Sequence, residues 1–154
     1  MTRKILLDAN LLIAAFDNNG TTSLESKQAA TEQLMNLLSS GDVQLFITPL
    51  VRYEVLRGIS WLNKEDFADM LQTLNQFPEL EVTRDISELS ANLFRFDKYQ
   101  AACANNTAKN LDKRKFDVFH FSSAHCNGLE FCSRDSDIAK IGQLHNIYQA
   151  TING

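Results

Sequence analysis

Short apolar runs alternate with longer stretches of helical periodicity along the chain. Ile5–Leu7 and Val43–Thr48 are nearly continuous apolar runs, which predict buried strands. Between them, residues 22–41 begin with the capping-box pattern of Thr22–Glu25, repeat apolar side chains at helical spacing, and stop at Gly41. Strands that are apolar throughout, rather than alternating, are typical of a parallel sheet covered on both faces.

The alternation of strand and helix continues to the end of the chain. Thr48 before Pro49 predicts a helix over residues 49–59, because a hydroxyl can cap the helix and proline suits its first turn. The other predicted elements are helices over 63–77, 85–104 and 116–128, strands over 80–84, 129–133 and 147–152, and a polar loop over 105–115. This order predicts a single α/β domain over residues 1–154, an α/β/α sandwich around a central parallel sheet of four or five strands.

Composition narrows the class of protein. The chain has 154 residues, 19 of them acidic and 15 basic, and its net charge of −4 does not by itself suggest a nucleic-acid partner. An acidic net charge does not exclude a local basic patch on the surface. The three cysteines lack paired spacing, so neither a disulfide framework nor a zinc site is indicated. Because no apolar run reaches the roughly 20 residues of a membrane span, and no signal sequence is visible, we expect a cytoplasmic protein without membrane association.

Three acidic residues follow predicted strands closely, and two more lie on helices that adjoin those strands. Asp8 directly follows the first strand, and Glu54 lies on the helix that leaves the second. Asp117 is on the helix leading to the strand at 129–133, and Asp135 and Asp137 come just after that strand. Because sites in parallel sheets lie beyond the carboxyl ends of the strands, we expect these carboxylates to gather at one edge.

Taken singly, each of these acids has an ordinary structural interpretation, such as a turn or a helix cap. Together they would repel one another, and a cation is one way to neutralise them. Oxygen ligands suit Mg²⁺ or Mn²⁺, and no Cys/His cluster competes for a softer metal. A set of carboxylates around such an ion suits metal-assisted hydrolysis of a phosphodiester bond.

Four segments of the chain resemble, in order and separation, the acidic motifs of PIN-domain nucleases: "LLDANLLI", "VRYEVLRG", "KFDVFHFSSAHCNG" and "FCSRDSDI". The chain is most similar to the VapC-type toxins among the small bacterial members. The resemblance implies a PIN-like fold whose catalytic and metal-binding acids are Asp8, Glu54, Asp117 and Asp135. Asp137 is an alternative to Asp135 as the fourth metal ligand, because the two lie two residues apart in a turn.

The polar neighbours of these acids have supporting roles in this interpretation. Asn10 is a candidate for bonding a metal-bound water or for organising the turn, and Ser133 for holding Asp135 or a water. Four basic residues are candidates for contacts to RNA phosphates: Lys113, Arg114, Lys115 and Arg134. The resemblance further implies a Mg²⁺- or Mn²⁺-dependent endoribonuclease, an RNA substrate, a homodimer and a cognate antitoxin protein.

The chain also departs from the family pattern, and other functions stay open. Bulky "VFHF" follows Asp117 where the family usually has small aliphatic residues, and the polar loop at 105–115 is long. A non-toxic PIN nuclease of RNA processing is the nearest alternative, and a catalytically silent α/β binding module is another. A phosphatase-like protein would place a second aspartate where this chain has Asn10, and we find no convincing match to phosphoacceptor receivers.

Overall fold

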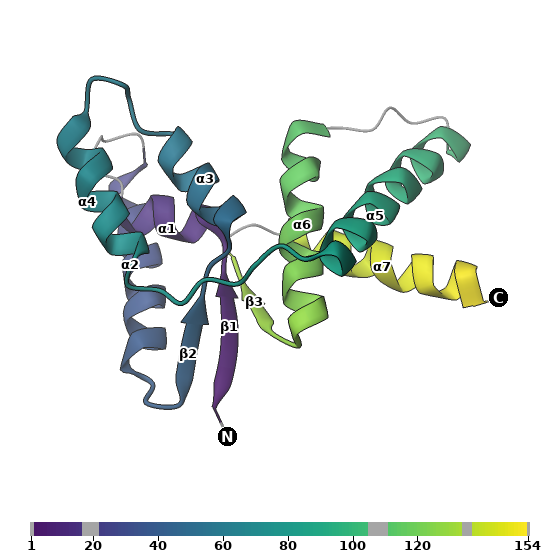
Figure 1. Ribbon diagram of the computed structural model, residues 1–154, viewed down its shortest axis with the longest axis horizontal. Helices are drawn as coiled ribbons and strands as arrows, with labels where there is room; N and C mark the ends of the chain where they lie inside the picture. The colour runs from purple at the N-terminus through teal and green to yellow at the C-terminus, as the bar shows by residue number, and fades with distance from the viewer. Residues whose placement is uncertain (1, 17–21, 105–110, 134–136, 154) are drawn as a thin grey trace. The chain divides into compact units, whose positions relative to one another are not determined.

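The computed structural model describes residues 2–16, 22–104, 111–133 and 137–153, and of residues 111–113 and 137 it describes only the backbone. The chain divides into two compact units. The first unit comprises Met1–Glu81 with Gly128–Arg134, and the second comprises Val82–Asn127 with Asp135–Gly154. Figure 1 labels the helices and strands of both units.

The first unit contains a parallel sheet with the strand order β2-β1-β3 (Figure 1). Its strands are β1 (Arg3–Leu7), β2 (Val43–Phe46) and β3 (Glu130–Cys132). The central strand β1 pairs Ile5 with Leu45 on one side and Leu7 with Cys132 on the other. Ile5–Leu7 are buried, which explains why the sequence there is apolar throughout. The predicted parallel α/β fold is therefore confirmed.

The sheet has fewer strands than the predicted four or five, since the described residues contain three. In place of the strand predicted at 80–84, Ile47 and Glu79 form an isolated bridge, and the main-chain N–H of Leu80 donates to the carbonyl of Ile47 at 2.9 Å. The strand predicted at 147–152 is wrong, because these residues are helical. β-branched residues there favour a strand locally, but packing over the whole helix decides otherwise.

Four helices of the first unit accompany the sheet: α1 (Ala9–Phe16), α2 (Leu24–Ser39), α3 (Pro49–Arg57) and α4 (Lys64–Leu74). The predicted start of α3 is confirmed, whereas the cap of α2 is one residue later than the capping-box pattern of Thr22–Glu25 placed it. The Ser23 side chain accepts a hydrogen bond from the N–H of Ser26 at the start of α2. Thr48 accepts one from the N–H of Val51, and Pro49 is the first residue of α3.

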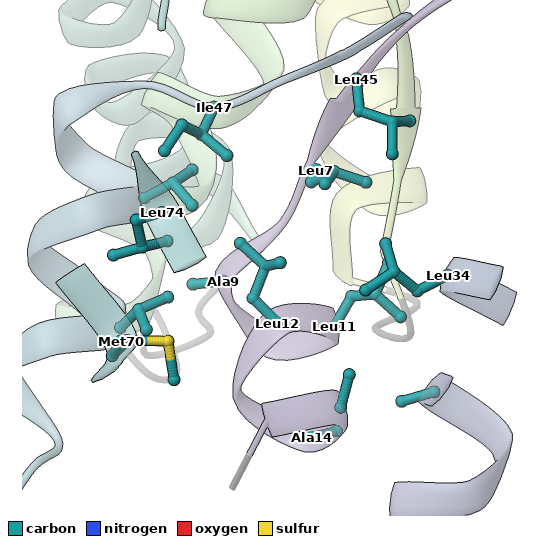
Figure 2. Packing of buried hydrophobic residues seen from close by; sticks show 14 of the residues in the cluster. Leu7, Ala9, Leu11, Leu12, Ala14, Leu34, Leu45, Ile47, Met70 and Leu74 are labelled. Carbon is teal, nitrogen blue, oxygen red and sulfur yellow. The ribbon is translucent and has the colours of Figure 1, made fainter. Parts of the chain in front are cut away.

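Buried aliphatic side chains from the strands and all four helices form the core of the first unit. Figure 2 shows side chains of this cluster, among them Leu7 of β1, Leu11, Leu12 and Ala14 of α1, and Leu34 of α2. Met70 and Leu74 of α4 and Ile47, just after β2, belong to the same cluster. This core fixes the carboxyl end of β1, from which Asp8 follows.

The described residues of the second unit form three helices: α5 (Arg84–Cys103), α6 (Leu111–Asn127) and α7 (Asp137–Asn153). α6 begins at Leu111, so the loop predicted over 105–115 is helical from that residue onward, and residues 105–110 lie outside the described ranges. The Thr83 side chain caps α5 by accepting a hydrogen bond from the N–H of Ile86, so the helix begins at Arg84, one residue before the predicted start. Four buried apolar residues form its hydrophobic cluster: Leu93, Val118, Ile141 and Leu144.

No helix among the described residues is both long enough and apolar enough to cross a lipid bilayer.

Candidate functional site

Asp8 occupies the junction between the central strand and the first helix. Its main-chain N–H donates to the carbonyl of Cys132 at 3.0 Å, which extends the pairing of β1 with β3 by one residue. Its carbonyl accepts from the N–H of Leu12 at 3.4 Å, which begins α1. Both ends of the residue are thus held by regular structure, and its side chain is only 3% exposed.

The carboxylate of Asp8 has a defined partner in this buried place. The Ser133 hydroxyl donates a hydrogen bond of 2.6 Å to Oδ2 of Asp8. A short hydrogen bond to an ionised acceptor is among the stronger kinds, and the amino end of α1 adds a favourable partial positive charge. These interactions offset part of the cost of burying a carboxylate. Ser133 was predicted to hold Asp135 or a water, and the contact observed is with Asp8.

Two further predicted residues lie on helices of the same unit. Asn10 is exposed in the first turn of α1, two residues after Asp8. Glu54 is half-buried on α3, and α3 packs against α1, the helix that Asp8 begins. The strand-end placement of Asp8 and the helical placement of Glu54 both agree with the sequence interpretation.

The sequence interpretation missed Gln33 and Cys132, two residues that contact each other next to the backbone of Asp8. The side-chain amide of Gln33, on α2, donates a hydrogen bond of 3.1 Å to Sγ of Cys132. Burial raises the pKa of the Cys132 thiol, the Gln33 hydrogen bond opposes this, and the charge of Asp8 raises it further.

Asp117 belongs to the second unit, on α6, and is 6% exposed. The residue after it, Val118, packs in the hydrophobic cluster of this unit, and its carbonyl accepts a hydrogen bond from the Ser90 hydroxyl of α5 at 3.3 Å. α5 and α6 are thus joined directly beside Asp117. A carboxylate buried in a helix interior, where no cap requires it, is unusual enough to support a functional role.

The predicted phosphate-binding residues have different surroundings. Nε of Arg114 lies 3.3 Å from Oδ2 of Asp97 on α5, so its guanidinium is engaged within the second unit. Lys115 is exposed. Arg134 and Asp135 lie outside the described residues, and for Lys113 and Asp137 only the backbone on α6 and α7 is described.

Within the part of the chain that the structure describes, no three His, Cys, Asp or Glu side chains are close enough together to hold a metal ion. The structure brings together Asp8 and Ser133. The convergence of all the predicted acids stays a prediction. The oxygen donors at Asp8 nevertheless have the chemistry that Mg²⁺ or Mn²⁺ prefers.

Comparison with known proteins identifies a family. Residues 5–144 match the sequence model of the PIN domain. No curated protein shows significant sequence similarity to the chain.

Three solved structures share the fold at low sequence identity. VapBC2 from Rickettsia felis, bound to a DNA fragment from its promoter, is 12% identical with a TM-score of 0.60, and the alignment covers 89% of this chain and 91% of that chain. DNA-bound VapBC from Salmonella typhimurium is 14% identical with a TM-score of 0.53, over 84% and 83%. A toxin–antitoxin complex from Klebsiella pneumoniae is 21% identical with a TM-score of 0.53, over 86% and 87%.

Proposed function

The chain belongs to the PIN-domain family, and we propose that it is a Mg²⁺- or Mn²⁺-dependent endoribonuclease of the VapC toxin type. The observation that carries this proposal is the buried carboxylate of Asp8, held by Ser133 at the carboxyl end of the central parallel strand. Ligands of parallel sheets bind at that end.

The residues proposed to hold the metal are Asp8, Glu54, Asp117 and either Asp135 or Asp137. A bound Mg²⁺ would lower the pKa of a water and stabilise the leaving oxygen of the phosphodiester. Ser133 donates to Oδ2 of Asp8 and thereby orients the carboxylate that we propose as a metal ligand. Lys115 is exposed and is proposed to contact RNA phosphates, together with Lys113, Arg114 and Arg134.

We infer that the protein has an antitoxin partner, because the solved structures with a similar fold are toxin–antitoxin complexes. The first unit offers an apolar cavity of about 340 Å³ where α3 is followed by α4, lined by Leu56, Ile59, Trp61 and Phe67, with Arg57 and Lys64 beside them. Trp61 is 88% exposed and the adjacent Leu62 86%. An amphipathic antitoxin segment with acidic side chains would cover the apolar residues and complement the two cations. A homodimer is also proposed.

Cleavage of labelled RNA with and without Mn²⁺ tests the nuclease directly. We expect cleavage that requires the metal and falls at least ~100-fold in Asp8→Asn and Asp117→Asn, because each removes a proposed metal ligand. Asp69→Asn is the matched control, since Asp69 is an exposed acid of α4. Circular dichroism checks that the variants fold. Cleavage that persists in Asp8→Asn contradicts the proposal, and absence of Mn²⁺ binding by calorimetry favours a silent binding module.

Growth after expression separates a toxin from an RNA-processing nuclease. If the protein is a toxin, expression of the wild type arrests growth and expression of Asp8→Asn does not. If it is a processing enzyme, expression of the wild type leaves growth unchanged. If the product of an adjacent small gene restores growth, Trp61→Asp is expected to abolish that rescue while leaving the arrest intact. Rescue that is unaffected by Trp61→Asp would place the antitoxin elsewhere.

A further inference from the structure

Two consecutive residues of the first unit hold Asp8, one by its backbone and one by its side chain. The carbonyl of Cys132 accepts from the N–H of Asp8, and the hydroxyl of Ser133 donates to its carboxylate. The direction of the carboxylate therefore depends on where residues 132 and 133 lie. A displacement of this short segment would move both supports at once.

The segment itself is weakly anchored by the sheet. β3 has three residues and forms one edge of the sheet, and its pairing with β1 ends at Cys132. A short edge strand has hydrogen-bonded pairing on one side only, so its last residue opens easily. Ser133 already lies beyond the strand. An additional contact at this point would have a direct effect on Asp8.

Gln33 supplies such a contact from α2. Its amide donates to Sγ of Cys132 at 3.1 Å across 99 positions of sequence, and the side chain is half-buried. The neighbouring Ala30 and Leu34 belong to the buried cluster, so the backbone of α2 is fixed at this point. Sulfur is a weak acceptor, but a rigid helix holding a short edge strand needs only a modest contact to restrict it.

We propose that Gln33 and Cys132 form a positioning pair that fixes the end of β3 and thereby aligns Asp8 and Ser133 for metal binding. The role in catalysis rests on the proposed nuclease function, whereas the fixing of β3 does not. Neither residue touches the reacting atoms. Loss of a group bonded directly to a metal ligand typically costs between 10-fold and 100-fold in activity or metal affinity. Gln33 acts one contact further away and through a weak acceptor, so we expect no more than ~10-fold here.

The test compares Gln33→Leu with Gln28→Leu, the same substitution at an exposed position of α2. The first measurement is amide hydrogen exchange at Asp8, whose N–H is bonded to Cys132. Removing the pair is expected to accelerate this exchange ~3-fold to ~10-fold, whereas Gln28→Leu leaves it unchanged. The second is RNA cleavage, where kcat is expected to fall by up to ~10-fold in Gln33→Leu with little change in KM, because alignment rather than substrate binding is lost.

Substitution of the partner provides a second route to the same contact. Cys132→Ala removes the acceptor and is expected to reproduce Gln33→Leu, whereas Cys132→Ser keeps an acceptor atom and is expected to restore most of kcat. The double variant is expected to be no worse than either single variant that loses the contact. If Gln33→Leu does not fold, Cys132→Ala carries the test.

The outcomes separate the two claims. Unchanged exchange at Asp8 in Gln33→Leu or Cys132→Ala overturns the pair. Faster exchange with unchanged kcat overturns its positioning role, because the contact is then only structural. If the wild type neither binds Mn²⁺ nor cleaves RNA, the proposed function fails, and the exchange measurement still decides whether the pair fixes β3.

Discussion

The two units of the chain bury different kinds of side chain. Among its described residues, the first unit packs fifteen buried apolar ones into one cluster, and its buried carboxylate at Asp8 is held by Ser133. Among its described residues, the second unit buries seven apolar side chains, of which four form its hydrophobic cluster, and six polar ones: Ser90, Asp117, His120, Ser122, Ser123 and His145. The first unit buries two polar side chains among its described residues, Asp8 and Thr48, so polar groups form a larger share of the buried residues in the second unit. Stability in the second unit is therefore expected to be more sensitive to hydrogen bonding and protonation.

The largest expected effect compares one leucine from each core. Leu12 and Leu93 are both fully buried. We expect Leu12→Ala to cost about 4 kcal/mol of unfolding free energy, and Leu93→Ala to cost about 2 to 3 kcal/mol, because the smaller cluster encloses less of the cavity that is left. Chemical denaturation measures both. Equal losses would show that the second unit packs its apolar residues as tightly as the first.

A smaller effect is expected from two buried or half-buried serines. Ser133→Ala removes the hydroxyl bonded to the Asp8 carboxylate, and we expect a loss of ~1 to 2 kcal/mol because the acceptor is charged. Ser90→Ala removes hydrogen bonds to the carbonyls of Ile86 and Val118, and we expect ~0.5 to 1 kcal/mol. The opposite order in denaturation experiments would contradict this assignment of the stronger polar contact to the first unit.

The third prediction concerns pH and belongs to the second unit. His145 is 7% exposed, and its ring centroid lies 4.5 Å from that of His125. Burial, and then the charge of His125, lower the pKa of His145 below its ordinary 6.5. Its neutral form stabilises the fold above pH 6.5, and this stability is lost as the pH falls below that value, because the unfolded chain takes up the proton first.

Thermal unfolding at about pH 7.5 and about pH 5.5 measures that loss. In His145→Leu the part of the pH dependence due to this ring is expected to vanish. His125→Gln is expected to reduce it, because the neighbouring charge is removed. An identical pH dependence in the wild type and His145→Leu would show that His145 is not the titrating group.

The smallest expected effect comes from removing buried hydroxyls of the second unit that make no hydrogen bond among the described residues. The hydroxyls of Ser122 and Ser123 are buried and have no hydrogen-bond partner among the described residues. Removing a buried hydroxyl of this kind should not destabilise, so Ser122→Ala and Ser123→Ala are expected to change the unfolding free energy by between 0 and about +1 kcal/mol. A loss above ~1 kcal/mol in either variant would show that the hydroxyl is used.

Local patterns predicted the elements whose signals agree with their packing. Thr48 and Pro49 marked the start of α3 because capping chemistry is local. α1 was missed, since its residues are apolar almost all round and show no helical stripe. Residues 147–152 were mistaken for a strand because β-branched side chains favour one locally, while α7 as a whole packs as a helix.

In the candidate site, too, local sequence signals could be predicted and contacts between distant residues could not. Asp8 could be found because an acid directly after a buried strand is visible in the sequence, and it lies where that pattern placed it. Its contacts to Cys132 and Ser133 join residues more than 120 positions apart, and no periodicity reports such a contact. Gln33 was missed for the same reason, because an amide at the margin of a helix face has no signature of its own.

The central claim is that the carboxylate of Asp8 binds a divalent metal with the help of the other predicted acids. A crystal structure of the chain grown with Mn²⁺ tests it most directly, since the anomalous signal locates the ion. We expect the ion to be coordinated by Asp8, with Glu54, Asp117 and Asp135 or Asp137 completing the site. An ion bound away from Asp8, or an Asp8 carboxylate without any ion at a saturating Mn²⁺ concentration, would contradict the account.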